Sequence, residues 1–369
     1  MPQWFEIADT SALDSPSLLI YKERVQHNIA QMIALAGSPE RLFVHVKTNK
    51  MPAVVQMMVA KGITSFKCAT IAEAEMTAAN GGRQIVIAHQ LVGPKRQRLL
   101  QLTEKFPDTV FYSLVDNFPT AQELAQIFSA AGKTACTLLD INNGMNRSGH
   151  LPDNEAVELY RQINRTAGIC CEGIHAYDGH IRDADFQTRK EKIDSVFLSV
   201  EEIIRRLEQT GEKVPILIAG GTPAYTAHRL REDVYCSPGT CVLWDWGYGD
   251  TLTEQPFQYA ALVLTRIISK PAPGLLSVDM GHKAIAAENP MDRRIRFLNL
   301  SDYELISQSE EHGVVRVADW EKWKVGDVLY GVPYHVCPTV NLYDEAYCIE
   351  NGQMTAVWEI TARRRRLSI

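Results

Sequence analysis

The sequence predicts an α/β protein in which a (β/α)8 barrel is followed by an antiparallel β domain. From residue 41 to about residue 240, short apolar runs alternate with amphipathic stretches, which is typical of parallel strands joined by crossover helices. The apolar runs number eight, as a closed barrel of this kind requires. After Trp246 the helical periods give way to short or alternating apolar runs separated by turn signals, which favours an antiparallel sheet.

Each barrel strand is expected where an apolar run is bounded by turn residues. The eight runs are 42–46, 64–68, 84–88, 110–114, 135–141, 170–176, 214–219 and 234–237. Helices are expected where apolar residues recur with a helical period. These stretches are 22–36, before the first barrel strand, and 52–60, 71–80, 95–106, 120–131, 154–167 and 186–209.

The chain of 369 residues is long enough for two domains at roughly 150 residues each. We assign 1–15 to an N-terminal segment that packs on the β domain, 16–248 to the barrel and 249–369 to the β domain. Strands of the β domain are expected at the apolar runs after the boundary. They are 259–268, 275–279, 314–317, 328–332 and 354–360.

Composition excludes several classes of protein. The net charge of −6 offers no basic surface for nucleic acid or an anionic membrane. No apolar run approaches the ~20 residues needed to span a bilayer, so we expect a cytoplasmic protein with no membrane partner. CxxC pairs, GxxxxGK[ST], GxGxxG and GxSxG are absent, which argues against a four-cysteine zinc module and the common nucleotide-binding and hydrolase motifs.

The polar residues at the carboxyl ends of the strands indicate the chemistry, because active sites of such barrels are built there. Lys47 ends the first apolar run, where loss of water would leave a neutral amine able to attack an aldehyde. The runs 220–222 (Gly-Gly-Thr) and 237–240 (Ser-Pro-Gly-Thr) end the last two strands and offer backbone N–H groups and hydroxyls to a phosphate. A lysine and an anion cradle in one barrel suit a phosphorylated aldehyde cofactor.

Four blocks of sequence resemble a known family. They are 45–51 (HVKTNKM), 144–149 (GMNRSG), 175–180 (HAYDGH) and 334–341 (YHVCPTVN), and the resemblance covers nearly the whole chain. The sequence is similar to the fold-type III pyridoxal-phosphate enzymes, the alanine-racemase-like group, and within it to the D-threonine aldolase and D-serine dehydratase family. The cofactor implied by this resemblance is pyridoxal 5'-phosphate.

The resemblance also implies roles for single residues. Lys47 would bond covalently to the cofactor aldehyde, with Lys50 as the rival lysine, and Arg147 would hydrogen-bond its phenolic oxygen. Tyr177 would lie beside the ring, and His180 is the candidate catalytic base, although Asp183 stands where aldolases carry a histidine. The residues implied to receive the phosphate are Gly221, Thr222, Gly239 and Thr240.

A metal pair is expected in the second domain. In a strand, His335 and Cys337 would point to one face, and imidazole with thiolate suits zinc. The resemblance implies a divalent metal bound through a histidine and a ligand two residues later. An aspartate at the second position is associated with manganese aldolases and a cysteine with zinc dehydratases, so zinc and manganese both stay open.

The function that follows is a lyase that uses pyridoxal phosphate and a divalent metal to act on small β-hydroxy-D-amino acids. D-threonine aldolase, which cleaves D-threonine to glycine and acetaldehyde, is the first choice. The alternatives are a zinc-dependent D-serine or D-3-hydroxyaspartate dehydratase, an amino-acid racemase and, in another class, a non-catalytic pyridoxal-phosphate-binding protein. The resemblance also implies a homodimer.

Overall fold

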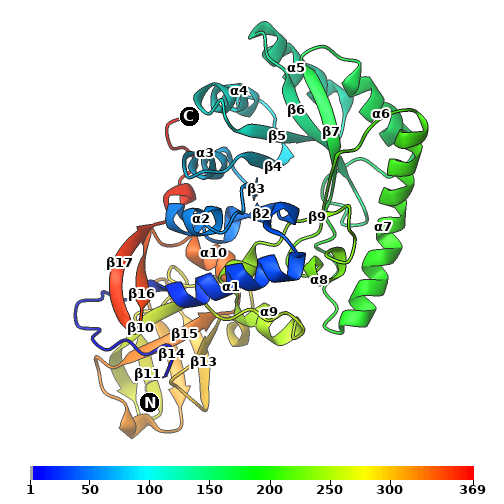
Figure 1. The fold of residues 1–369 in the computed structure, drawn as a ribbon. Coiled ribbons are helices and arrows are strands. Elements are labelled where there is room, and N and C mark those ends of the chain that lie inside the picture. Colours follow the sequence, from blue (N-terminus) through cyan, green and yellow to red (C-terminus); the bar gives the residue numbers. More distant parts are fainter. Residues whose placement is uncertain (1–2) are drawn as a thin grey trace. The chain divides into compact units, whose positions relative to one another are not determined.

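A computed structural model describes residues 3–369, and the chain divides into two compact units (Figure 1). The barrel unit comprises Met32–Lys47, Val55–Gly239 and Arg364–Ile369, and the sheet unit comprises Met1–Gln31, Thr48–Val54 and Thr240–Arg363. The units interleave along the chain, since Thr48–Val54 and Met1–Gln31 both belong to the sheet unit. The division at 15 and 248 made from the sequence stays a prediction.

Eight parallel strands form a nearly closed barrel in the barrel unit, as the sequence predicts. Strand order follows chain order from β2 to β9. The first and last strands are joined by backbone hydrogen bonds, from Phe43 N to Cys236 O at 2.9 Å and from His45 N to Pro238 O at 2.8 Å. The strands are β2 (Val44–His45), β3 (Ser65–Cys68), β4 (Gln84–Gln90), β5 (Val110–Val115), β6 (Ala135–Ile141), β7 (Ile169–Ala176), β8 (Ile216–Ala219) and β9 (Tyr235–Cys236).

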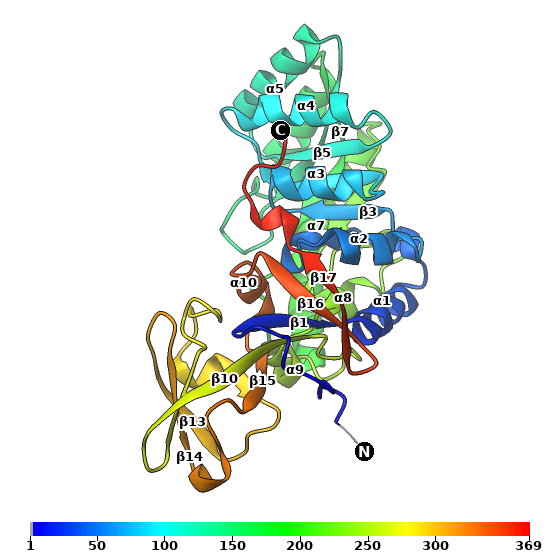
Figure 2. The same ribbon diagram turned by 90° about the vertical axis from the view of Figure 1, so that its left-hand side faces the viewer.

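Helices follow the strands around the outside of the barrel, as Figure 2 shows for α3 and α4 beside β3 and β5. Side chains cap several of them: Thr70, Asn117 and Asp185 accept hydrogen bonds from the first helical turn. These helices are α2 (Pro52–Val59), α3 (Ile71–Ala79), α4 (Lys95–Lys105), α5 (Phe118–Ala130), α6 (Asn154–Asn164), α7 (Phe186–Gln209) and α8 (Tyr225–His228), while α1 (Lys22–Ala36) precedes the first barrel strand.

Apolar side chains from strands on different sides of the barrel fill its interior. The barrel therefore has a packed core rather than a pore, which leaves the strand ends as the place for a binding site. The members of this cluster are Phe43, Val86, Tyr112, Leu114, Leu138, Ile216 and Ile218.

The sheet unit contains a nine-stranded sheet whose main order is β13-β14-β11-β10-β1-β16-β17, with β15 pairing with β10 and β12. It is antiparallel except that β1 runs parallel to β16. The strands are β1 (Ser17–Tyr21), β10 (Ala261–Ala272), β11 (Leu275–Val278), β12 (Ile295–Phe297), β13 (Tyr303–Gln308), β14 (Gly313–Val317), β15 (Val328–Pro333), β16 (Glu345–Glu350) and β17 (Gln353–Glu359). Helices α9 (Trp246–Thr251) and α10 (Val336–Val340) complete the unit.

The sheet unit differs from the sequence-based expectation in two ways. Strand β1 pairs with β10 and β16, whereas its residues were assigned to the barrel domain. The parallel β1–β16 pair makes the sheet mixed rather than purely antiparallel. Phe5, Ile7 and Leu13 pack into one of the two cores of this unit together with Leu262 and Leu264.

In the part of the chain that the structure covers, residues 3–369, none of the helices combines the length and apolar character required for crossing a membrane.

Two adjacent isoleucines of β10 can be used to test which face of this strand packs into the core of the sheet unit. Ile267 is fully buried and Ile268 is 38% exposed, because successive side chains of a strand point to opposite faces. Ile267→Ala is expected to lower the free energy of unfolding by about 2–5 kcal/mol, and Ile268→Ala by less than about 1 kcal/mol. Urea unfolding of the full chain measures both. Equal losses from the two variants would contradict this register.

Candidate active site

A cavity of about 310 Å³ opens at the carboxyl ends of the barrel strands. Lys47, Arg147 and Tyr177 all line it, so the structure brings together three residues predicted from sequence. The remaining lining residues are His45, Lys67, Ala69, Ala88, His89, Ser148 and His175. A cavity of this size lies at the lower end of the range for small-molecule sites.

The two rival lysines occupy different environments. Lys47 follows β2 directly, lies in a short 3-10 turn and lines the cavity. Its backbone N–H donates to His45 Nδ1 at 3.3 Å. Lys50 belongs to the sheet unit, has a φ of 55° and accepts a backbone hydrogen bond from Ala362 N at 3.2 Å. Of the two, Lys47 is therefore the one within reach of a ligand in the cavity.

Arg147 is held by a closed loop after β6. His150 N donates to Asp140 O at 2.8 Å and Asn142 N donates to His150 O at 2.9 Å, which brings both ends of the loop together. Gly149 makes this closure possible: its φ is 97°, and a Cβ there would lie 2.6 Å from Asn142 N. The Arg147 guanidinium lies 4.8 Å from the centre of the Tyr177 ring.

A buried chain of polar groups forms the floor of the cavity, and sequence reasoning missed it. Lys67 Nζ lies 3.3 Å from His175 Nε2, and His175 Nδ1 lies 2.7 Å from Asp140 Oδ1. Ser148 Oγ donates to the other Asp140 oxygen at 3.0 Å. With Nδ1–H donated to the carboxylate, His175 Nε2 accepts a hydrogen bond from Lys67.

Lys67 is the cationic member of this row of polar groups, and only 2% of its surface is exposed. Burial, together with repulsion from Lys47, lowers the pKa of Lys67 to about 7. Burial also lowers the pKa of His175, which keeps its imidazole neutral. The sequence carries a signal for Lys67, since this lysine lies inside the apolar run 64–68, although it precedes the strand end where a site is expected.

The predicted phosphate-binding turns lie next to each other at the ends of β8 and β9. Gly239 N donates to Thr222 Oγ1 at 3.2 Å, and His45 N holds the second turn through Pro238 O at 2.8 Å. Ser237 Oγ is buried and has no hydrogen-bond partner in residues 3–369. A buried hydroxyl without a partner costs free energy unless a ligand satisfies it, so these turns fit an anion.

Gly221 contributes through its lack of a side chain. A Cβ at Gly221 would lie 2.9 Å from the Tyr177 ring, so only glycine lets the turn approach Tyr177 this closely. The cations around the cavity, the orphan Ser237 hydroxyl and these turns together fit pyridoxal phosphate. Lys47 would hold its aldehyde carbon, Arg147 its phenolic oxygen, and Ser237, Thr222 and the glycine amides its phosphate.

The proposed metal pair lies in the sheet unit, but not in a strand. Strand β15 ends at Pro333, His335 is the N-cap residue of α10 and Cys337 lies in its first turn. The expectation that both side chains share a strand face is therefore wrong. The helix turn brings the two residues together, and the Thr48 hydroxyl lies 3.1 Å from Cys337 Sγ with that of Thr240 at 3.6 Å.

Acidic neighbours make the surroundings of His335 suitable for a cation. Glu288 Oε1 lies 2.7 Å from His335 Nδ1, which leaves Nε2 available for a metal. Burial lowers the pKa of His335, but Cys337, Asp245 and Glu288 outweigh burial and raise the pKa to about 9. Burial raises the pKa of Asp245 to about 6. Imidazole and thiolate in an acidic setting are a donor set that fits zinc.

His180, the candidate base, does not line the cavity. It is exposed in the loop after β7, with Nε2 3.3 Å from where a Cβ on Gly144 would lie. Asp178 of the same loop forms a buried pair with His228 of α8, whose Nε2 lies 2.7 Å from Asp178 Oδ2. The cavity itself is lined by Lys47, Lys67, His175, His45 and His89, side chains of the types that can transfer protons.

Comparison with known proteins identifies the family. The family model for the alanine racemase N-terminal domain matches residues 20–244, and the model described as "Putative serine dehydratase domain" matches residues 260–349. This chain belongs to the alanine-racemase-like family. The family uses pyridoxal phosphate, and the first model covers every residue that lines the cavity.

Several relatives that match over nearly the whole length are aldolases or dehydratases, which are lyases. A D-threonine aldolase of Arthrobacter sp is 29% identical over 95% of this chain and 93% of its own. A 3-hydroxy-D-aspartate aldolase of Paracoccus denitrificans (strain Pd 1222) is 27% identical over 96% of this chain and 93% of its own. The crystal structure of D-threonine aldolase from Filomicrobium marinum has a TM-score of 0.87 at 26% identity and covers 95% of both chains. The predictions of the fold class, the family and a lyase are confirmed.

Substitution of the rival lysines tests the covalent attachment of the cofactor. Lys47→Ala is expected to abolish the visible absorbance band of bound pyridoxal phosphate, because the covalent bond to the lysine nitrogen is lost. Lys50→Ala is the matched control and should keep the band. Loss of the band in Lys50→Ala with retention in Lys47→Ala would show that the assignment is wrong.

Lys67 is expected to make stability depend on pH. The unfolded chain binds a proton on Lys67 up to pH near 10.5, whereas the folded chain releases it near pH 7. Stability therefore rises with pH across this window relative to Lys67→Met, by up to roughly 4 kcal/mol. Urea unfolding of both proteins at pH 7 and pH 10 measures the difference. A difference that does not change with pH would mean that Lys67 stays charged when folded.

Proposed function

We propose that this protein is a lyase that uses pyridoxal phosphate and a divalent metal to act on β-hydroxy-D-amino acids. The reaction we favour is the cleavage of D-threonine to glycine and acetaldehyde. The observation that supports it best is the cavity lined by Lys47, Arg147 and Tyr177, together with the proposed phosphate-binding turns at the ends of β8 and β9, one of which approaches the Tyr177 ring through Gly221. The full-length similarity to aldolases supports the same reaction type.

Bound pyridoxal phosphate supplies an electron sink for the carbon that bears the amino group of the substrate. The residues of the chain do the rest. Lys47 Nζ would hold the cofactor and, once a substrate amine is bound, would be able to carry a proton. Arg147, fixed by its closed loop and lying over the Tyr177 ring, stabilises a negative oxygen through charge-assisted hydrogen bonds.

The Lys67–His175–Asp140 chain has a definite part in this proposal. With the pKa of Lys67 near 7, its Nζ holds or releases a proton at neutral pH, while His175 Nε2 accepts its hydrogen bond. Asp140 keeps His175 in the required tautomer through Nδ1. A group whose pKa lies near the working pH suits acid–base chemistry in the cavity.

A second candidate function is dehydration of D-serine or D-3-hydroxyaspartate. The observation that favours it is Cys337, since a thiolate beside His335 suits zinc better than manganese. A D-threo-3-hydroxyaspartate dehydratase of Delftia sp. (strain HT23) is 24% identical over 94% of this chain. In that reaction Lys47 Nζ would take the proton from the carbon that bears the amino group. His335 and Cys337 would hold the divalent metal in either case, where it would act as a Lewis acid. We also propose that the chain forms a homodimer, as the family resemblance implies.

Incubation with D-threonine distinguishes these reactions. The full chain, supplied with pyridoxal phosphate and either zinc or manganese, is expected to release glycine and acetaldehyde in equal amounts. Mass spectrometry of the products measures this. Formation of 2-oxobutanoate and ammonia would favour the dehydratase, and epimerised threonine would favour a racemase.

Two controls accompany this assay. L-threonine should not be cleaved, because the proposal specifies the D configuration. Chelation should abolish turnover of D-threonine, and added zinc or manganese should restore it. Retained cofactor binding with no turnover of D-threonine, D-serine or 3-hydroxyaspartate would contradict the proposed lyase and favour a non-catalytic binding protein.

A further inference from the structure

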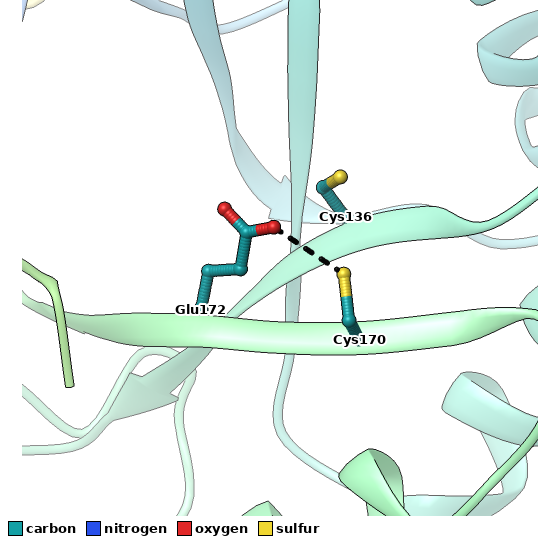
Figure 3. A group of neighbouring side chains, drawn as sticks. All are labelled: Cys136, Cys170 and Glu172. Atoms are coloured by element: carbon teal, nitrogen blue, oxygen red, sulfur yellow. Dashed lines mark hydrogen bonds between the residues drawn. The ribbon is translucent and has the colours of Figure 1, made fainter. Parts of the chain in front are cut away.

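A group of side chains able to hold a metal ion lies in the barrel unit, away from the cavity. Figure 3 shows Cys136 on β6 with Cys170 and Glu172 on β7. One ligand atom of each lies within 4.8 Å of the other two, and within residues 3–369 no other group of three His, Cys, Asp or Glu side chains meets that distance. All three residues are half-buried.

The strand register places these side chains together. Cys136 and Cys170 are directly paired on neighbouring parallel strands, so their side chains point to the same side of the sheet. Glu172 is two residues further along β7 and shares that side. Cys136 packs against the apolar barrel core. Both cysteines are the second residue of their strand, whereas the cavity is at the strand ends, so the group lies at the opposite mouth of the barrel.

The distances within the group suit a small tetrahedral ion. Cys170 Sγ lies 3.5 Å from Glu172 Oε1. In a tetrahedral zinc site with bonds of about 2.3 Å to sulfur and about 2.1 Å to oxygen, these two ligand atoms are about 3.6 Å apart. The strands that carry them are held by backbone pairing along the barrel, so the ligands are positioned before any ion binds.

The Glu172 carboxylate is oriented by hydrogen bonds but has no cationic side chain as a partner in residues 3–369. Tyr112 donates its hydroxyl to Glu172 Oε2 at 3.1 Å, which orients the carboxylate and turns Oε1 toward Cys170. No lysine, arginine or histidine in residues 3–369 forms an ion pair with Glu172. A half-buried carboxylate beside two thiols, with no cationic partner, is a site that a positive ion would stabilise.

We propose that Cys136, Cys170 and Glu172 form a structural site for one thiophilic divalent ion of the zinc class, with water as the fourth ligand. The ion would link β6 to β7 at the amino-terminal mouth of the barrel. This inference goes beyond the proposed function and does not depend on it, because none of the three residues lines the cavity. The ion would stabilise the folded state by binding to it in preference to the unfolded chain.

Metal content of the full chain tests this site. In a His335→Ala/Cys337→Ala background, which removes the metal pair of the proposed active site, zinc is added and excess metal is removed by gel filtration. One zinc per chain is expected to remain. Adding Cys136→Ser/Cys170→Ser should reduce this to zero, whereas Cys171→Ser should leave it unchanged, since the Cys171 side chain points to the other side of β7. Cobalt should give thiolate-to-cobalt charge-transfer absorption in the same background.

Glu172→Gln provides a second variant of unchanged size in case the double serine variant does not fold. It should weaken zinc binding at least tenfold in a competition with a chromophoric chelator, with the Cys171→Ser protein as the reference. Zinc content below one per chain in the background variant would overturn the proposal. So would zinc that survives Cys136→Ser/Cys170→Ser, or loss of the two thiols to a disulfide under conditions that leave the other cysteines reduced. None of these outcomes bears on the proposed function, which the D-threonine assay tests separately.

Discussion

Closure of the eight-stranded barrel is the constraint on which the candidate site depends. Lys47 follows the first strand and the turn 237–240 follows the last, so they are far apart along the chain. The hydrogen bonds from Phe43 N to Cys236 O and from His45 N to Pro238 O make these strands neighbours. An open sheet with the same strand order would leave its first and last strands at opposite edges. Only the closed arrangement places the lysine beside the anion-binding turn.

The barrel interior explains why the cavity can hold several cations. Large apolar side chains such as Phe43 and Leu138 fill the barrel below the site, so the polar groups gather at the strand ends. There, Lys47, Lys67 and Arg147 face one cavity with Asp140 as a nearby carboxylate. Burying a cation is costly, and burial together with repulsion from Lys47 lowers the pKa of Lys67. An anionic cofactor relieves this repulsion, which couples cofactor binding to the electrostatics of the barrel.

Much of the barrel could be predicted because its signals are local. Helices α1 and α7 have long amphipathic periods and appear within the expected bounds, and all eight barrel strands lie at the expected apolar runs. Strand β1 could not be assigned to its sheet, because its partners β10 and β16 lie hundreds of residues later in the chain. Helix α10 is too short to show a helical period in the sequence, so the pattern around His335 and Cys337 predicts a strand instead.

The candidate site could be predicted only in part, because some of its residues have local sequence signals and others depend on contacts between distant strands. Lys47, Arg147 and Tyr177 stand in distinctive blocks at strand ends. Lys67 and His175 acquire their meaning only from a contact between β3 and β7, which are not neighbours in the sheet. Cys136 and Cys170 looked like small apolar residues of two separate runs until the register paired them. Sequence patterns do not show which residues of different strands come into contact in the folded barrel.

The most direct test of the central claim is a crystal structure of the full chain grown with pyridoxal phosphate. The cofactor should be covalently attached to Lys47 Nζ, with its phosphate on Ser237 Oγ and the turns at Gly221–Thr222 and Gly239. Attachment to another lysine, or a phosphate bound away from the ends of β8 and β9, would contradict the view that barrel closure builds this site.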